Sequence, residues 1–296
     1  MDAMIRLECL IQLRYDAQSS GTFILNVEPA ASTHQRIVAE DLRLDGDTGP
    51  VERHVTSEGT RLIRFDATGP LTITSRFTVD IDHQTRPAHE LHEIAPQHLP
   101  LEMLPYLLPS RYAESDKLMQ HAKQSFGAIA PGYGRVSAIA DWVRETVAFR
   151  VGTSRWDTSA ADTLSQRQGV CRDFAHLMIA VCRALNMPAR FVTGVDYGAD
   201  PALGPVDFHA YVEVFLGDRW FVFDPTGISP TTGLLRLGTG RDASDVAFAT
   251  IFGDVTCWAP YLEIAAVEAP DQGIFLPERT RDPVSTADGP ISKMRH

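Results

Sequence analysis

The sequence predicts an α+β protein whose N-terminal part is an antiparallel β domain and whose C-terminal part contains helices and further strands. Two patterns of hydrophobicity support this prediction. Apolar and polar residues alternate over residues 5–15 and 71–81, which is typical of half-buried antiparallel strands. Apolar residues spaced three and four positions apart follow over residues 118–126, 136–147 and 174–185, which is typical of amphipathic helices.

The two parts are joined by a proline-rich segment, residues 86–109, in which neither pattern continues. We therefore predict an antiparallel β domain over residues 1–105 and a second domain over residues 106–296. The joining segment holds several histidines. His89 and His92, however, lack the H-E-x-x-H spacing that places two metal ligands on one helical face. We expect a solvated linker here and no metal site.

Composition and charge exclude several classes of protein. The chain has 296 residues, 44% of them hydrophobic, and a formal net charge of -11. Because phosphate-rich partners require a basic surface, we expect neither a nucleic acid nor an anionic membrane as the partner. No apolar run approaches the roughly 18 residues of a membrane span, and the first residues lack the features of a secretory signal. The four cysteines do not form a disulfide framework in a chain of this length, and we expect a reducing cytoplasm.

Cys171 lies where the apolar pattern of the third helix begins. The unpaired N–H groups and the dipole of a helix N-terminus favour the thiolate of a cysteine, which is the strong nucleophile. Gly169 allows a sharp turn before this helix and leaves space for the backbone of a substrate. The alternative is a cysteine that only fills space, and this interpretation suits Cys9, Cys182 and Cys257 better.

His209 and Asp224 lie in two strand-like segments joined by the hairpin signal Gly217-Asp218. If Leu216 pairs with Arg219, His209 becomes the diagonal neighbour of Asp224 on one face of the hairpin. Diagonal neighbours are about 7–8 Å apart at the backbone, within side-chain reach. One extra loop residue would send His209 to the opposite face.

His176 is another candidate base. It lies five residues after Cys171, so its side chain points about 140° around the helix from the thiol, at roughly 100° per residue. We therefore expect His176 to pack or to form a hydrogen bond inside the protein.

Three segments resemble the signature segments of the bacterial transglutaminase-like superfamily. They are Gly-Val-Cys-Arg-Asp-Phe-Ala-His-Leu at 169–177, His-Ala-Tyr-Val-Glu-Val at 209–214 and Phe-Asp-Pro-Thr at 223–226. Gly240-Arg241-Asp242 with Asp245 is similar to a less specific downstream signature. The resemblance covers most of the chain, because a β domain often precedes this core in the family.

The resemblance implies a papain-like core, in which helices pack on an antiparallel sheet that supplies the histidine and the aspartate. If the roles known in the family are transferred to the matching residues, Cys171 is the nucleophile. His209 acts first as a base and then as an acid, and Asp224 orients the imidazole. Family members can use an upstream aromatic or amide group as a second oxyanion donor. The candidates for that role are Trp156, Gln166 and Gln168.

These residues support acyl transfer without a cofactor. The favoured reaction is hydrolysis of an amide bond in a peptide, a protein or a small amide through a Cys171 acyl-enzyme. Transfer of the acyl group to an amine, as in a transglutaminase cross-link, would use the same residues. A non-catalytic binding module with the same fold is the third alternative. The sequence is also compatible with a homo-oligomer.

Overall fold

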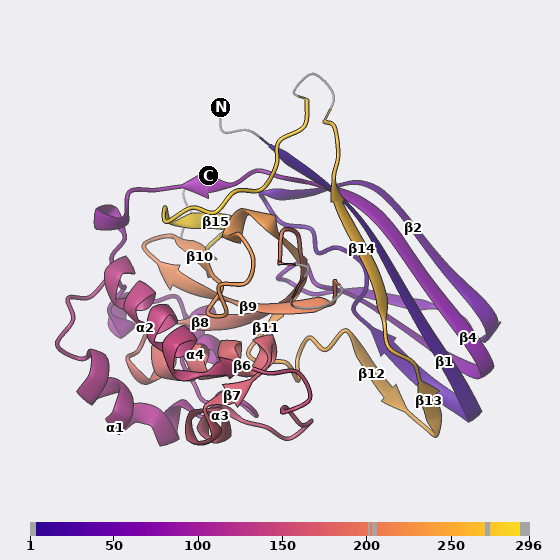
Figure 1. Ribbon diagram of the computed structural model, residues 1–296, viewed down its shortest axis with the longest axis horizontal. Helices are drawn as coiled ribbons and strands as arrows, with labels where there is room; N and C mark the ends of the chain where they lie inside the picture. Colours follow the sequence, from indigo (N-terminus) through magenta and orange to yellow (C-terminus); the bar gives the residue numbers. More distant parts are fainter. Residues whose placement is uncertain (1–3, 201, 203–205, 270–272, 291–296) are drawn as a thin grey trace.

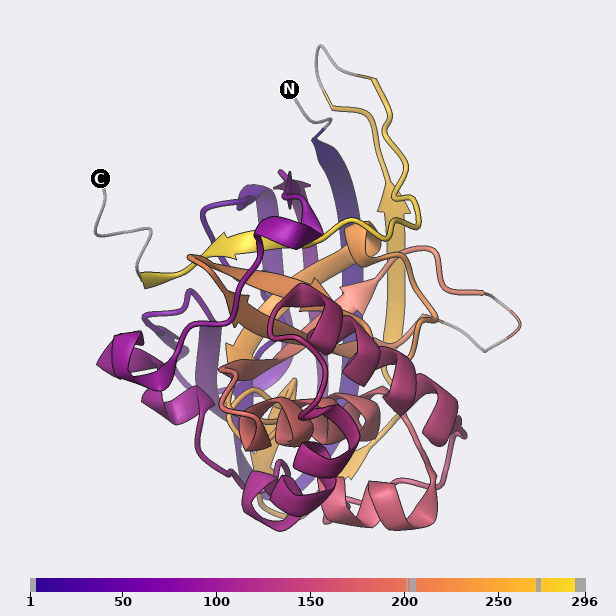
Figure 2. The same ribbon diagram turned by 90° about the vertical axis from the view of Figure 1, so that its left-hand side faces the viewer.

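The computed structural model describes residues 4–200, 202, 206–269 and 273–290. It contains two large antiparallel sheets and a group of helices, which confirms the predicted α+β class. Long strands lie on one side of the molecule and the helices on the other, with the second sheet between them (Figure 1). Figure 2 shows the same arrangement with the helices toward the viewer.

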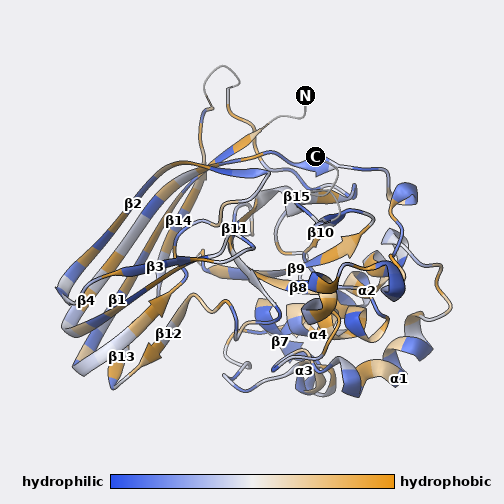
Figure 3. Cartoon of the chain, turned by 180° about the vertical axis from the view of Figure 1, so that it is seen from behind, coloured by the Kyte–Doolittle hydropathy of each residue, from blue (hydrophilic) through white to orange (hydrophobic). Residues whose placement is uncertain are grey.

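The first sheet is built on β1 (Ile5–Leu25) and β4 (Arg61–Ile81), which pair over almost their whole length. β2 (Gln35–Thr48) and β3 (Glu52–Val55) pair with the other edge of β4. Polar and apolar residues alternate along these strands, as Figure 3 shows. The alternation predicted for residues 5–15 and 71–81 is therefore confirmed as strand structure.

The remaining strands of the first sheet come from the other end of the chain. β12 (Ala249–Phe252), β13 (Val255–Cys257) and β14 (Tyr261–Ala266) all pair with β1. No pattern in the sequence predicted that these strands belong to the N-terminal sheet. The domain boundary at residue 105 stays a prediction. The first sheet, however, contains strands from before and from after this residue.

The first sheet bends back on itself near the middle of β1. The pairing register of β1 with β4 shifts between Ala17 and Gly21. Across this irregularity the rings of Tyr15 and Phe23 lie 5.3 Å apart. Residues eight positions apart in a straight strand would be separated by about 26 Å, at 3.3 Å per residue. Gly69 pairs with Ala17 at the bend and has a φ of 71°. The two halves of the sheet thus enclose an apolar core.

The second sheet carries the helices. Its strand order is β11-β8-β9-β10-β15-β5, and every pairing is antiparallel. The bounds are β5 (Gln84–Thr85), β8 (Ala189–Asp196), β9 (Phe208–Leu216), β10 (Arg219–Phe223), β11 (Leu234–Gly240) and β15 (Val284–Asp288). A short parallel pair, β6 (Ala148–Phe149) with β7 (Gln168–Gly169), lies apart from it.

Four α-helices cover one face of the second sheet. They are α1 (Ser115–Phe126), α2 (Tyr133–Thr146), α3 (Ala160–Gln166) and α4 (Cys171–Ala184), so the three predicted helical segments are confirmed. α4 is the central one, and its apolar stripe shares a buried core with the alternate residues of β9 that face it. The members of this contact are Phe174, Leu177, Met178, Val181, Ala210, Val212 and Val214.

The opposite face of the second sheet is covered by the first. Val195 of β8 and Leu235 and Leu237 of β11 are buried in the apolar core of the first sheet. The segment between the two parts contains short 3-10 helices, η1 (Ala88–Glu90), η2 (Pro96–His98) and η3 (Leu101–Tyr106); a further one, η5 (Thr231–Gly233), precedes β11. In the described part of the chain, no helix has both the length and the apolar character to cross a membrane.

We expect Gly69→Ala to lower the free energy of unfolding by about 1–2 kcal/mol, because a side chain makes a positive φ unfavourable. The Cβ would meet no neighbouring atom within 4 Å, so the loss would come from the backbone alone. Gly134→Ala is the matched control. That glycine lies in α2 with equally open space around it, and alanine there should be neutral or stabilising. Urea unfolding measures both; equal stability of the two variants would contradict the bend described here.

Candidate active site

Cys171 is the first residue of α4, and a buried carboxylate fixes the start of this helix. Asp173 accepts hydrogen bonds from the N–H of Val170 at 2.9 Å and from the hydroxyl of Ser154 at 2.9 Å. A Cβ at position 169 would lie 2.7 Å from this carboxylate, so only glycine fits there. The sequence Gly-Val-Cys-Arg-Asp thus holds a half-buried thiol at a helix N-terminus, with an acidic side chain in the first turn satisfying the backbone.

His209 is the second residue of β9 and is buried. The register of β9 with β10 pairs Leu216 with Arg219 and Val212 with Phe223, which confirms the predicted hairpin. In consequence His209 Nε2 lies 3.3 Å from Asp224 Oδ2, just beyond the end of β10.

Asp224 is held by the turn that follows it. Its Oδ1 accepts hydrogen bonds from the N–H of Thr226 at 2.9 Å and from the hydroxyl of Thr226 at 2.6 Å. The second oxygen, Oδ2, is the one that faces His209 and also lies 3.4 Å from the N–H of Ser229. The carboxylate is therefore fixed in orientation before it contacts the imidazole.

The charges of the buried pair support each other. Burial alone would lower the pKa of His209, but the charge of Asp224 outweighs it and Cys171 adds to the effect, so this pKa is raised well above its usual value. For Asp224, burial would raise the pKa, but the charge of His209 and the hydrogen bonds from Thr226 lower it. Each of the two side chains therefore favours the charged form of the other.

The structure brings the three predicted residues together. His209 and Cys171 line the same cleft, and His209 also contacts Asp224. Cys171 Sγ also lies 4.0 Å from the carbonyl oxygen of Phe208, the residue before the histidine. The thiol, the imidazole and the carboxylate thus lie in one region of the structure.

His176 has a different place. It is fully buried between Tyr112 and Phe191, whose ring centres each lie 5.0 Å from its own. Its Nε2 accepts a hydrogen bond from the N–H of Ala243 at 3.2 Å. Burial lowers its pKa to about 3, so it is neutral. The expectation that His176 packs inside the protein is confirmed, and its contact holds the loop that follows β11.

A cleft of about 1150 Å³ opens at Cys171 and His209. One wall is formed by aromatic residues near the helices, Tyr112, Phe149 and Trp156. The other wall includes Ala249 and Thr250 of β12 and Ile264 of β14, which belong to the first sheet. Both sheets therefore shape the space in front of the thiol.

The three candidates for a second oxyanion donor lie in different places. Trp156 lines the cleft and is 71% exposed. Gln166 ends α3 and is exposed, and Gln168 lies in the short strand β7; neither is among the residues that line the cleft. The geometry thus favours Trp156 among the three.

Sequence reasoning missed several residues of the cleft. Tyr112 stacks on His176 and donates its hydroxyl to the carbonyl of Trp156 at 2.8 Å, so it links the two loops of one wall. Phe208 and Phe248 stack with ring centres 4.1 Å apart on the other side. No local pattern marks them, because each owes its role to contacts between distant segments. Among the described residues, no three histidine, cysteine or acidic side chains are grouped as metal ligands.

Comparison with known proteins identifies the family of the chain. Residues 120–225 match the model of the transglutaminase-like superfamily. A crystal structure from Cytophaga hutchinsonii, described as that of a candidate cysteine protease, is 35% identical with a TM-score of 0.85, over 95% of this chain and 97% of that one. An uncharacterized protein of Mycobacterium tuberculosis is 30% identical over 74% of this chain and 77% of its own length. One of Mycobacterium leprae is 26% identical over 82% and 91%.

The chain therefore belongs to the transglutaminase-like superfamily. The family and the likeness to the Cytophaga hutchinsonii protein support a thiol-dependent enzyme as its general class.

Asp224→Asn tests the charge between the two buried side chains. Because the pKa of His209 is raised in the folded state, the pair stabilises the protein fully below the histidine pKa of the unfolded chain, about 6.5. This contribution is lost as the pH rises through the folded-state pKa. We therefore expect the stability difference between the native protein and Asp224→Asn to decrease as the pH rises above about 6.5 and through the raised folded-state pKa of His209. Urea denaturation at several pH values measures it.

Asp242→Asn is the control, because Asp242 is also a buried carboxylate but has its nearest histidine, His176, in the neutral form. This variant should leave the pH dependence above about 6.5 unchanged. A stability difference for Asp224→Asn that stays constant over the same range would contradict the ion pair.

Proposed function

We propose that the chain is a thiol-dependent acyl-transfer enzyme that hydrolyses an amide or peptide bond through an acyl-enzyme on Cys171. The single observation that carries the proposal is that Cys171 and His209 line one cleft, while Asp224 contacts His209 at 3.3 Å. A space-filling cysteine would need neither a protonated histidine nor an open cleft in front of it.

The first half of the reaction forms a thioester. The thiolate of Cys171 attacks the carbonyl carbon of the substrate, and negative charge develops on the carbonyl oxygen. The N–H of Cys171, free at a helix N-terminus, and the side chain of Trp156 are the candidate donors to this oxygen. The C–N bond then breaks as the imidazolium of His209 gives its proton to the departing amine.

The second half releases the acyl group. Neutral His209 takes a proton from a water molecule, which attacks the thioester carbonyl, and Cys171 leaves as the thiolate beside the restored imidazolium. Asp224 is ionised beside the imidazolium, because the charge of His209 and the hydrogen bonds from Thr226 lower its pKa although burial opposes this. Its part is to hold the ring and to stabilise the imidazolium.

The substrate class follows from the shape of the cleft. Its volume of about 1150 Å³ and its aromatic wall suit a peptide, a protein segment or a large amide. All four cysteines are free, which suits a reducing compartment such as the cytoplasm.

A screen of peptide and amide libraries with intact-mass detection tests the proposal. Cys171→Ala should reduce turnover by at least about a thousandfold, because the nucleophile is lost. Its free energy of unfolding should change by less than about 1 kcal/mol, because the thiol is only half buried. Cys257→Ala is the control: Cys257 is an exposed thiol outside the cleft, and its loss should change neither quantity.

The same assay separates hydrolysis from its alternatives. Product formed with an added primary amine in place of water would overturn the hydrolase assignment in favour of amine transfer. Alkylation of Cys171 by a small electrophile no faster than that of Cys257, together with no turnover of any library member, would support a non-catalytic binding module.

A further inference from the structure

A second, smaller pocket lies between the two sheets, at a place that shares no residue with the cleft. Its volume is about 160 Å³, room for about five water molecules at roughly 30 Å³ each. Hydroxyl side chains and two arginines form much of its lining, namely Ser32, Thr33, Thr56, Ser57, Arg190 and Arg236. Such a set of donors is typical of a site for an oxyanion.

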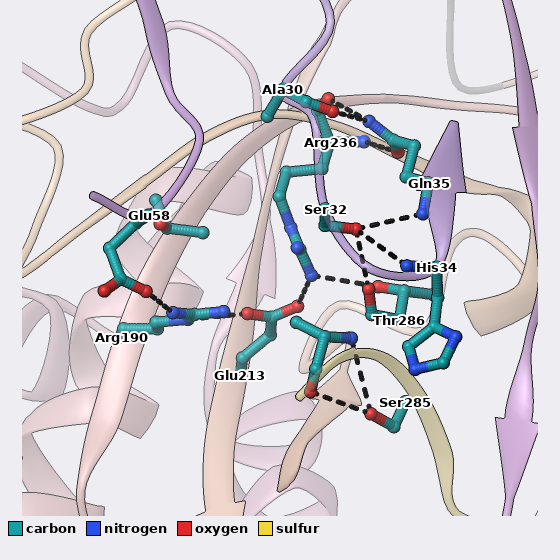
Figure 4. A network of polar contacts seen from close by, with 12 residues as sticks. Ala30, Ser32, His34, Gln35, Glu58, Arg190, Glu213, Arg236, Ser285 and Thr286 are labelled. Carbon is teal, nitrogen blue, oxygen red and sulfur yellow. Dashed lines mark hydrogen bonds and ion pairs between the residues drawn. The ribbon is translucent and has the colours of Figure 1, made fainter. Parts of the chain in front are cut away.

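The two arginines meet at one buried carboxylate. Arg190 of β8 donates through Nε to Glu213 of β9 at 2.7 Å, and Arg236 of β11 donates to the other oxygen of Glu213. Arg190, Glu213 and Arg236 are each at least 98% buried. Figure 4 shows the two guanidinium groups reaching Glu213 from different directions. The network thus places two fixed positive charges on a single internal carboxylate, beside the pocket.

Arg236 is left with an unused donor. Its Nη2 serves Glu213 and the hydroxyl of Thr286, but its Nε is buried and has no hydrogen-bond partner among the described residues. A buried donor of a charged group without a partner is unfavourable, and such groups usually mark a missing ligand or water. The same arginine lines the pocket, but its Nε is enclosed by protein atoms, so a ligand in the pocket meets other atoms of this side chain.

Two carboxylates also border the pocket, but arginines already hold both. Glu58 accepts a hydrogen bond from Arg190 Nη1 at 2.6 Å, and Asp288 lies 2.9 Å from Arg219 Nη1 and 3.3 Å from His34 Nε2. Glu58 lies in the loop between β3 and β4 and is partly exposed, so its side chain can be displaced. It occupies the position from which a free carboxylate or phosphate would bind Arg190.

We propose that this pocket binds a small oxyanion, of the carboxylate or phosphate class, with Arg236 and Arg190 as the cationic partners and the hydroxyl groups of the lining as further donors. The positive charges of three arginines and the negative charges of three carboxylates around the pocket cancel. The ligand is therefore recognised by fixed hydrogen-bond donors and not by a net charge. The Glu58 carboxylate competes with the ligand for Arg190. The ligand joins the first sheet to the second, because its partners come from both.

The test measures the melting temperature and the heat of binding with sodium phosphate, sulfate or acetate, each against sodium chloride at the same ionic strength. A ligand that binds only the folded protein raises its melting temperature. We expect at least one oxyanion to do so in a saturable manner, and the comparison of the three identifies the preferred class.

Glu58→Gln is the informative variant. It removes a negative charge next to the ligand and releases one donor of Arg190, so affinity should rise about tenfold. Glu52→Gln is the matched control, since Glu52 is an exposed carboxylate of the neighbouring strand β3, paired with Arg64 away from the pocket. It should leave the affinity unchanged.

Three results would overturn the proposal. The first is that no oxyanion produces a response in either the native protein or Glu58→Gln. The second is an equal gain in affinity for Glu58→Gln and Glu52→Gln. The third is loss of binding after alkylation of Cys171, which would place the ion in the cleft. Ser57→Leu, which fills the pocket mouth from an exposed position, should weaken binding without loss of folding. Unchanged affinity in this variant would also contradict the site.

Discussion

The contact between His209 and Asp224 is the interaction on which the rest of the candidate site depends. Both side chains are buried, and burial disfavours the charged form of each. Only their proximity reverses this, and the proximity follows from the register of a tight hairpin and from a turn at Thr226 that fixes the carboxylate. A shift of that register by one residue would move His209 to the opposite face of the hairpin. Its imidazole would then lie away from Asp224 and from the thiol.

The fold brings the thiol of Cys171 to the region of this pair through a different element. α4 packs its apolar stripe on the inner face of β9, and its N-terminus, fixed by Asp173 and Gly169, places Cys171 near the first residue of β9. The first sheet then completes the cleft with strands that follow the core in sequence. The β domain is in this way part of the wall that a substrate would contact.

Local patterns in the sequence predicted the elements and the geometry that depends on neighbouring residues. The helix start at Cys171, the register from Leu216 to Arg219 and the packing role of His176 all follow from spacing within a few residues. The pairing of β12, β13 and β14 with β1 joins segments more than 220 residues apart, and nothing local signals it. The buried network of Arg190, Glu213 and Arg236 was missed for the same reason, because each residue lies on a different strand and only the assembled sheet brings them together.

Intact-mass spectrometry of the protein during reaction with a chromogenic active ester tests the central claim most directly. We predict a single acyl group that appears in a burst, maps to the peptide containing Cys171, and disappears when a thiol or water completes turnover. In Asp224→Asn the same adduct should form more slowly. Acylation spread equally over the exposed thiol of Cys257 and Cys171, or none at Cys171, would contradict a nucleophile prepared by a buried imidazolium and its carboxylate.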